Sequence, residues 1–106
     1  MQEENAKQTP APEIKVTLSR PLPDGRTEVI LDFERVTGHV LIQCEKDAKK
    51  DDPSMLVPAL SQSYQARIAA VAGKVKIDDI LDLPADDFTA MTITVQSFLT
   101  HTGRQA

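Results

Sequence analysis

Large apolar residues recur in the last third of the chain at intervals of three, four, three and one. They are Phe88, Met91, Val95, Phe98 and Leu99. At about 100° per residue all of them fall within one arc of a helical wheel, whereas strand alternation would separate Phe88 from Met91. The β-branched run at 92–95 favours a strand by propensity, but that preference is only about a few tenths of a kcal/mol per residue. The spacing therefore predicts a helix over residues 85–101.

The N-terminal part of the chain has an apolar period of two instead. Residues that alternate in this way share one face of a strand. Between the two alternating runs lies Asp24-Gly25, a pair that tolerates positive φ in a chain reversal. We therefore predict a β-hairpin over residues 13–33, which is marginal alone in water and must pack its apolar face on other elements. The expected inward residues are Ile14, Val16 and Leu18, followed by Val29, Leu31 and Phe33.

The region between the hairpin and the last helix shows a helical period. We predict helices over residues 38–50, 57–72 and 76–82, with Thr37 as the first N-cap and Pro53 as a breaker. Gly73 is expected to stop the second helix. The expected inward stripes are Val40, Leu41, Cys44 and Ala48, then Leu60, Tyr64, Ile68 and Val71, then Ile77, Ile80 and Leu81.

These elements predict an α+β fold that is mainly α, with an N-terminal β-hairpin packed on a bundle of about four helices. A chain of 106 residues is long enough for one small core, so we expect a single globular domain over residues 13–103. Residues 1–12 are polar and have almost nothing to bury. They are expected to form a disordered arm.

The charge balance argues against two classes of partner. The chain has 12 Lys+Arg and 16 Asp+Glu, with a net charge of −4. We therefore expect neither nucleic acid nor an acidic membrane surface as a partner. The polar N-terminus is not typical of a secretory signal, and the single cysteine, Cys44, fits a reducing compartment. We expect a soluble, cytoplasmic protein.

The sequence offers no convincing catalytic, cofactor or metal site, so we expect the protein not to be an enzyme. His39 and His101 are far apart, and neither has metal-ligand spacing with Cys44. Cys44 is interpreted as a buried structural thiol. The aspartates of the C-terminal half lack the calcium-loop pattern and are interpreted as acids at helix starts, where the dipole stabilises them. They are Asp78, Asp79, Asp82, Asp86 and Asp87.

Ile93 does not fit the apolar stripe of its predicted helix. It lies about 140° from Phe88 and almost opposite the centre of that stripe, with Ala90 and Ser97 one turn away on the same face. Ile42 lies similarly off the stripe of the first helix. Such residues are usually unremarkable surface side chains. Alternatively, Ile93, Ala90, Ser97 and Ile42 belong to a second contact surface, for a partner or for another copy.

Three stretches together resemble the small tail assembly chaperones of tailed bacteriophages. Residues 14–21, Gly25 and residues 27–33 resemble an "I-x-L-x-x-P … G … x-L-x-F" hairpin. Residues 33–41 are similar to "F-x-x-L/V-T-G-x-D-L", although Val40 stands where an acid is common. The segment from Ala69 to Leu99 resembles the terminal "A-A … L-x-x-L-x-x-x-D-F … V-x-x-F-L" pattern. The resemblance spans roughly residues 13–100.

This resemblance implies a non-enzymatic chaperone in the cytoplasm of the bacterial host. Proteins of this family are thought to coat the tape measure protein and recruit tail tube subunits, and they are absent from the mature virion. Tape measure and tail tube proteins are then the expected partners, and self-association is left open. A virion structural component, such as a head–tail connector or tube-capping protein, is the alternative. A transcriptional regulator is disfavoured, because no basic recognition helix is present.

Overall fold

The computed structural model describes residues 13–102, and the predicted N-terminal arm lies outside these residues. The chain begins with the expected hairpin. Strand β2 (Glu13–Thr17) pairs antiparallel with β3 (Glu28–Asp32), so that Val16 lies opposite Val29. The ladder continues one step further, where the N–H of Leu18 donates to the Thr27 carbonyl at 2.8 Å. Gly25 adopts a φ of +95° in the connection, a conformation that glycine tolerates without steric cost.

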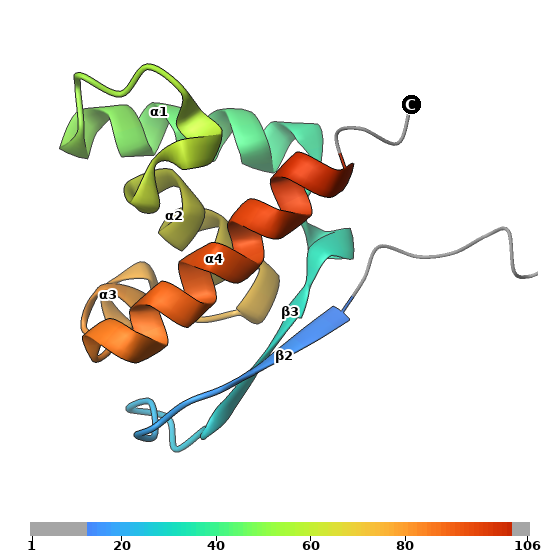
Figure 1. Ribbon diagram of the computed structural model, residues 1–106, viewed down its shortest axis with the longest axis vertical. Helices are drawn as coiled ribbons and strands as arrows, with labels where there is room; N and C mark the ends of the chain where they lie inside the picture. The colour runs from blue at the N-terminus through green and yellow to red at the C-terminus, as the bar shows by residue number, and fades with distance from the viewer. Residues whose placement is uncertain (1–12, 103–106) are drawn as a thin grey trace, which may run out of the picture.

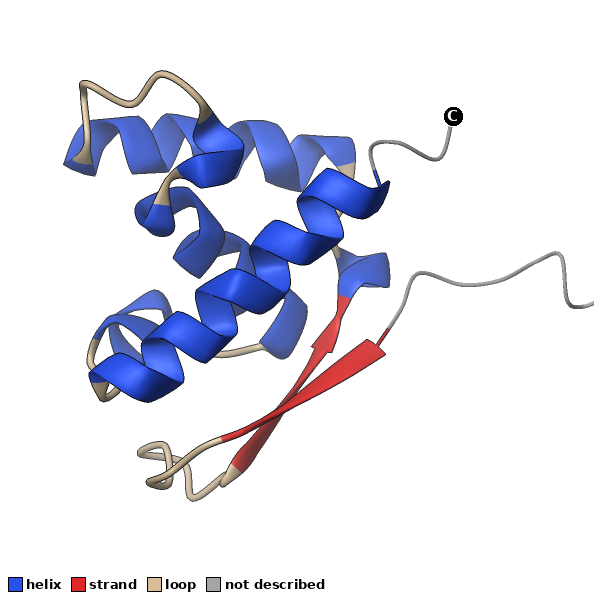
Figure 2. Ribbon diagram, in the orientation of Figure 1, coloured by secondary structure: helices blue, strands red, loops and turns tan. Residues whose placement is uncertain are grey.

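Helices form the rest of the fold, which is α+β and mainly α, as predicted (Figures 1 and 2). The Thr37 hydroxyl accepts from the Val40 N–H and caps the first α-helix. In chain order the helical elements are η1 (Phe33–Arg35), α1 (Gly38–Asp51), η2 (Pro58–Leu60), α2 (Gln62–Gly73), α3 (Ile77–Leu81) and α4 (Ala85–Thr102).

Helix α2 is the centre of the packing. Helices α1, α3 and α4 and strand β3 all pack against it, while α4 also lies along β2 (Figure 1). The hairpin contributes its predicted face to the core, since Val29, Leu31 and Phe33 are almost fully buried. The rings of Phe33 and Phe98 stack with centroids 4.0 Å apart and planes inclined by 7°. This contact joins the end of β3 to the last turns of α4.

The second helix begins later than predicted. The expected helix over 57–72 is a 3-10 turn at Pro58–Leu60 followed by α2 from Gln62. The cause is Ser61, which has an extended backbone and accepts the Tyr64 N–H on its hydroxyl, so it caps the helix at this point. Because Leu60 lies before the cap, it is 60% exposed, and its predicted inward position is wrong.

Two further expectations for this region are corrected. Gly73 is the last residue of α2, and the left-handed residue that ends the helix is Lys74, with a φ of 54°. Gly73 is buried against the hairpin instead: a Cβ there would lie 2.5 Å from Cγ1 of Val29. Leu81 was expected to point inward, but it is the last residue of the short helix α3 (Ile77–Leu81) and is 49% exposed. Only Ile80 of this helix is buried.

Candidate partner-binding surfaces

The predicted off-stripe residues of α4 do share one exposed face. Ile93 is 55% exposed, and Ala90 and Ser97, one turn before and one turn after it, are exposed as well. We call these three residues the α4 face. The opposite side of the helix supplies Met91 and Val95, both fully buried. The helix therefore uses its wide apolar stripe for the core and leaves a narrower strip on the surface, in which Ile93 lies between the small side chains of Ala90 and Ser97.

Ile42 lies on a different surface. It is 59% exposed on α1, a helix that packs chiefly on α2. The structure therefore does not unite the four predicted residues in one site. Ala90, Ile93 and Ser97 lie together, and Ile42 lies apart.

A second exposed apolar group was missed by the sequence interpretation. Leu56 is 91% exposed, Val57 54% and Leu60 60%, and all three lie in the connection between α1 and α2. We call this group the apolar loop. Met55 beside it is buried and anchors the connection, and a shallow depression of about 340 Å³ adjoins the loop. The run M-L-V-P-A-L at residues 55–60, which follows Pro53, could have indicated this group, but residues 57–60 were included in the predicted second helix.

Gln65 holds the apolar loop next to α4. This side chain is 2% exposed, and its amide nitrogen donates to the Ala59 carbonyl at 2.6 Å and to Oε1 of Gln96 at 3.3 Å. Gln96 lies one helical turn after Ile93. The polar bridge therefore fixes η2 against the segment of α4 that carries the α4 face.

Cys44 is a buried thiol, as interpreted from the sequence. It is 5% exposed, and burial, with a smaller contribution from the charge of Asp47, raises the pKa of the thiol. It lies at the floor of a groove of about 240 Å³ between α1 and α2, whose other walls include Val40 and Val71. A raised pKa disfavours the thiolate, which is the nucleophilic form.

Most of the C-terminal aspartates lie where predicted. Asp78, Asp79 and Asp86 are in the first turns of α3 and α4, but Asp82 is the C-cap of α3 and not a helix-start acid. Asp87 is in the first turn of α4 and is only 5% exposed, because its carboxylate accepts hydrogen bonds from Ser19. Within residues 13–102, no group of three or more His, Cys, Asp or Glu side chains is arranged to hold a metal ion.

Comparison with models of protein families, with curated proteins and with solved structures finds no match to this chain. In the part of the chain that the structure describes, no helix has the length and apolar character needed to cross a membrane.

Proposed function

We propose that this protein is a non-enzymatic tail assembly chaperone of a tailed bacteriophage, which binds the tape measure protein and helps to recruit tail tube subunits. The observation that supports the proposal is the surplus of aliphatic surface on the helical side of the molecule. Ile93 of the α4 face and Leu56 and Leu60 of the apolar loop remain exposed after the core is complete. Single exposed aliphatic residues are common on any protein, but exposed aliphatic residues that lie together are typical of protein-binding surfaces.

The chemistry of such a partner agrees with this surface. A long helical protein has apolar faces that aggregate when they are left uncovered. Ile93 is flanked by the small side chains of Ala90 and Ser97, so a partner helix can approach α4 closely and place its own apolar residues on both sides of the isoleucine. A narrow strip gives a modest contact that tail tube subunits can displace, and repetition along the partner supplies the total affinity. In this role the protein acts in the cytoplasm of the bacterial host and is absent from the mature virion.

Co-expression with a tape measure fragment tests the proposal. We expect the wild-type chain to keep the fragment soluble and Ile93→Asp to lose most of this effect, because a carboxylate in the strip would have to be desolvated. Leu81→Asp is the matched control, since it places the same charge at an exposed leucine on α3. Ile42→Asp tests the second predicted position. Circular dichroism and thermal unfolding establish that each variant is folded.

The experiment distinguishes a wrong binding surface from a wrong function. If folded Ile93→Asp solubilises the fragment as well as Leu81→Asp does, the α4 face is not the binding surface. If the wild-type chain does not solubilise any tape measure fragment, the chaperone proposal fails. Detection of the chain in purified virions by mass spectrometry would favour a virion structural component.

A further inference from the structure

Strand β3 has an outer edge whose backbone groups are available for pairing. The Leu18–Thr27 hydrogen bond fixes the phase of the ladder, and hydrogen-bonded pairs alternate with non-bonded pairs in antiparallel strands. Glu28 and Ile30 therefore belong to non-bonded pairs with β2, and their N–H and C=O groups point away from it. Among the residues that the structure describes, nothing is hydrogen-bonded to these outward groups.

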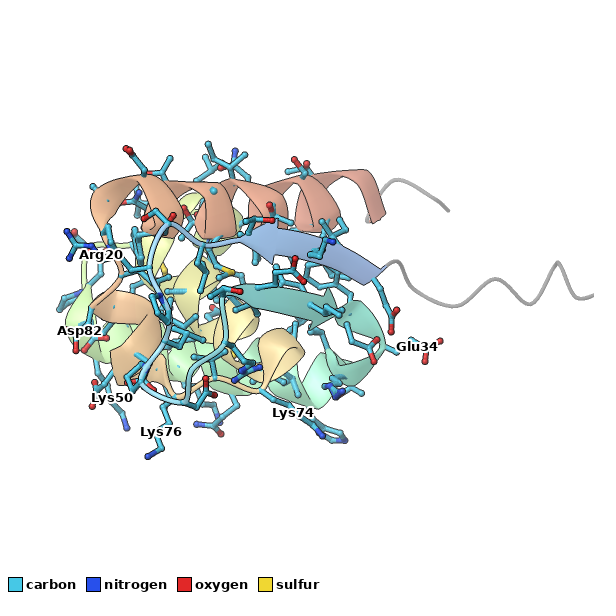
Figure 3. The ribbon with its side chains drawn as sticks, turned by 90° about the horizontal axis from the view of Figure 1, so that it is seen from below. Arg20, Glu34, Lys50, Lys74, Lys76 and Asp82 are labelled. Atoms are coloured by element: carbon cyan, nitrogen blue, oxygen red, sulfur yellow. The ribbon has the colours of Figure 1, made fainter. Side chains whose placement is uncertain are left out.

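The two edges of the hairpin have different surroundings. In Figure 3, β2 lies between α4 and β3, and Lys74 and Lys76 lie beyond β3 on the other side. The Ser19–Asp87 hydrogen bonds tie the end of β2 to α4. A groove of about 220 Å³ runs beside β3 and ends at the C-terminus of α2. Ile30, which is 53% exposed, contributes an aliphatic wall to it.

The groove is positively charged in a protein whose net charge is −4. Arg26, Arg35 and Lys74 line it, against one carboxylate, that of Glu28. Glu28 is already paired with Lys15 at 3.5 Å. Asp24 and Asp32 offset part of the charge of Arg26 and Arg35, at 2.9 and 3.8 Å, while no ion pair of Lys74 is present among the described residues. Basic groups at both ends of an open strand edge favour an acidic, extended ligand.

We propose that β3 binds an extended acidic segment of a partner protein, which adds to the hairpin as a further strand. Its backbone pairs with Glu28 and Ile30, one of its apolar side chains covers Ile30, and its flanking carboxylates lie near Arg26, Arg35 and Lys74. A second copy of β3 is a poorer occupant. In the symmetric pairing centred on Ile30, Glu28 of each copy would stand opposite Asp32 of the other, and like charges directly opposite are destabilising.

A short synthetic peptide tests this site without any tape measure or tube protein, so its result is independent of the function proposed above. The peptide has alternating valine and threonine flanked by two acidic residues at each end. We expect it to shift the amide NMR signals of residues 28–32 and to slow hydrogen exchange at Glu28 and Ile30. N-methylation of the peptide on the face that pairs with β3 removes its donors and is expected to weaken binding about tenfold or more.

Charge variants provide the second arm of the test. Lys74→Glu is expected to weaken binding of the peptide about three- to tenfold, while Lys76→Glu, an exposed lysine outside the groove, has a smaller effect. Equal binding of the N-methylated and unmodified peptides would overturn strand addition. Amide signals that shift only at residues outside β3 would overturn it as well. Equal binding of poly-glutamate would show charge attraction alone. Sedimentation that reveals a dimer through β3 in the absence of peptide would assign the edge to a second copy and also overturn the proposal.

Discussion

The carboxylate of Asp87 accepts hydrogen bonds from both the backbone N–H and the hydroxyl of Ser19. The N–H lies 3.1 and 3.0 Å from the two carboxylate oxygens, and the hydroxyl lies 2.8 Å from Oδ2. Ser19 follows β2, whereas Asp87 is in the first turn of α4, 68 residues later. The pair therefore fixes the hairpin to the N-terminus of the helix that carries the α4 face.

We expect Asp87→Asn to lower the free energy of unfolding by about 1–3 kcal/mol, because one of the two acceptor oxygens becomes a donor that faces other donors. Ser19→Ala removes only the hydroxyl and should cost less, about 0.5–1.5 kcal/mol. Asp86→Asn is the matched control, since Asp86 is exposed in the same helical turn. Urea denaturation measures all three. A loss for Asp87→Asn no larger than that for Asp86→Asn would contradict the structural role of the pair.

Gly73 and Val29 are in such close contact that a side chain at position 73 cannot be accommodated without movement. A Cβ on Gly73 would lie 2.5 Å from Cγ1 of Val29 and 3.2 Å from Cδ2 of Leu31. Overpacking of this kind costs about 1–3 kcal/mol, against a gain of about 1 kcal/mol from replacing glycine by alanine in a helix. We therefore expect Gly73→Ala to destabilise the protein on balance by up to about 2 kcal/mol in chemical denaturation.

Two variants make the Gly73 test specific. Gly38→Ala is the control, because no atom beyond its chain neighbours and its own helix backbone lies within 4 Å of the added Cβ, and it should not destabilise. Combining Gly73→Ala with Val29→Ala removes the clashing methyl group, so the double variant should lose less stability than the sum of the single variants. Additive losses would show that the contact between position 73 and Val29 is not the cause.

Sequence periodicity was sufficient to predict which side chains point to the core wherever a regular helix or strand alone decides their direction. The wheel that placed Phe88, Met91 and Val95 inward also placed Ile93 outward, and its exposure is confirmed. The role of Ile93 in binding stays a prediction. The hairpin face was predictable for the same reason, since period two determines which side chains point to the core.

Some roles were missed or misassigned because they depend on a distant partner. Gly73 was assigned to helix termination because glycine commonly ends helices, but its closest constraint is Val29, which belongs to the hairpin. Asp87 is in the first turn of α4, as the sequence predicts, but its bond to Ser19 depends on how the hairpin packs and was missed. One signal was available: Asp87 is four residues before Met91, so it lies on the inward face of α4.

Cys44 should be chemically unreactive in the native protein. Its thiol is 5% exposed, and its pKa is raised by burial, so the thiolate population near pH 8 is low. We expect a thiol reagent such as DTNB to react at least about tenfold more slowly with the native protein than with the urea-unfolded chain. Equal rates would contradict the buried position.

The raised pKa of Cys44 also determines the direction in which the stability of the protein changes with pH. As the pH rises, the thiol of the unfolded chain ionises first, near its ordinary pKa of 9.0. The contribution of Cys44 to the free energy of unfolding is therefore fully present below pH 9 and is lost as the pH rises above it. The stability of the wild-type protein relative to Cys44→Ala should therefore fall on going from pH 8 to pH 10. The pKa of Tyr64 is raised chiefly by burial and less by the charges of Cys44 and Glu45, so the effect of burial on Tyr64 is common to both proteins and the smaller effect of Cys44 is not.

Lys74 adopts a left-handed backbone, with φ 54° and ψ 51°, at the end of α2. This conformation costs about 1–2 kcal/mol for a residue with a Cβ and nothing for glycine. Glycine also makes the unfolded chain more flexible, which costs about 0.4–1 kcal/mol. We therefore expect Lys74→Gly to stabilise the protein by about 0.5–1 kcal/mol, since the bond that its carbonyl accepts from Arg26 at 2.8 Å is kept. Lys76→Gly is the control: at a φ of −65° it should only destabilise, so thermal unfolding must rank Lys74→Gly above it.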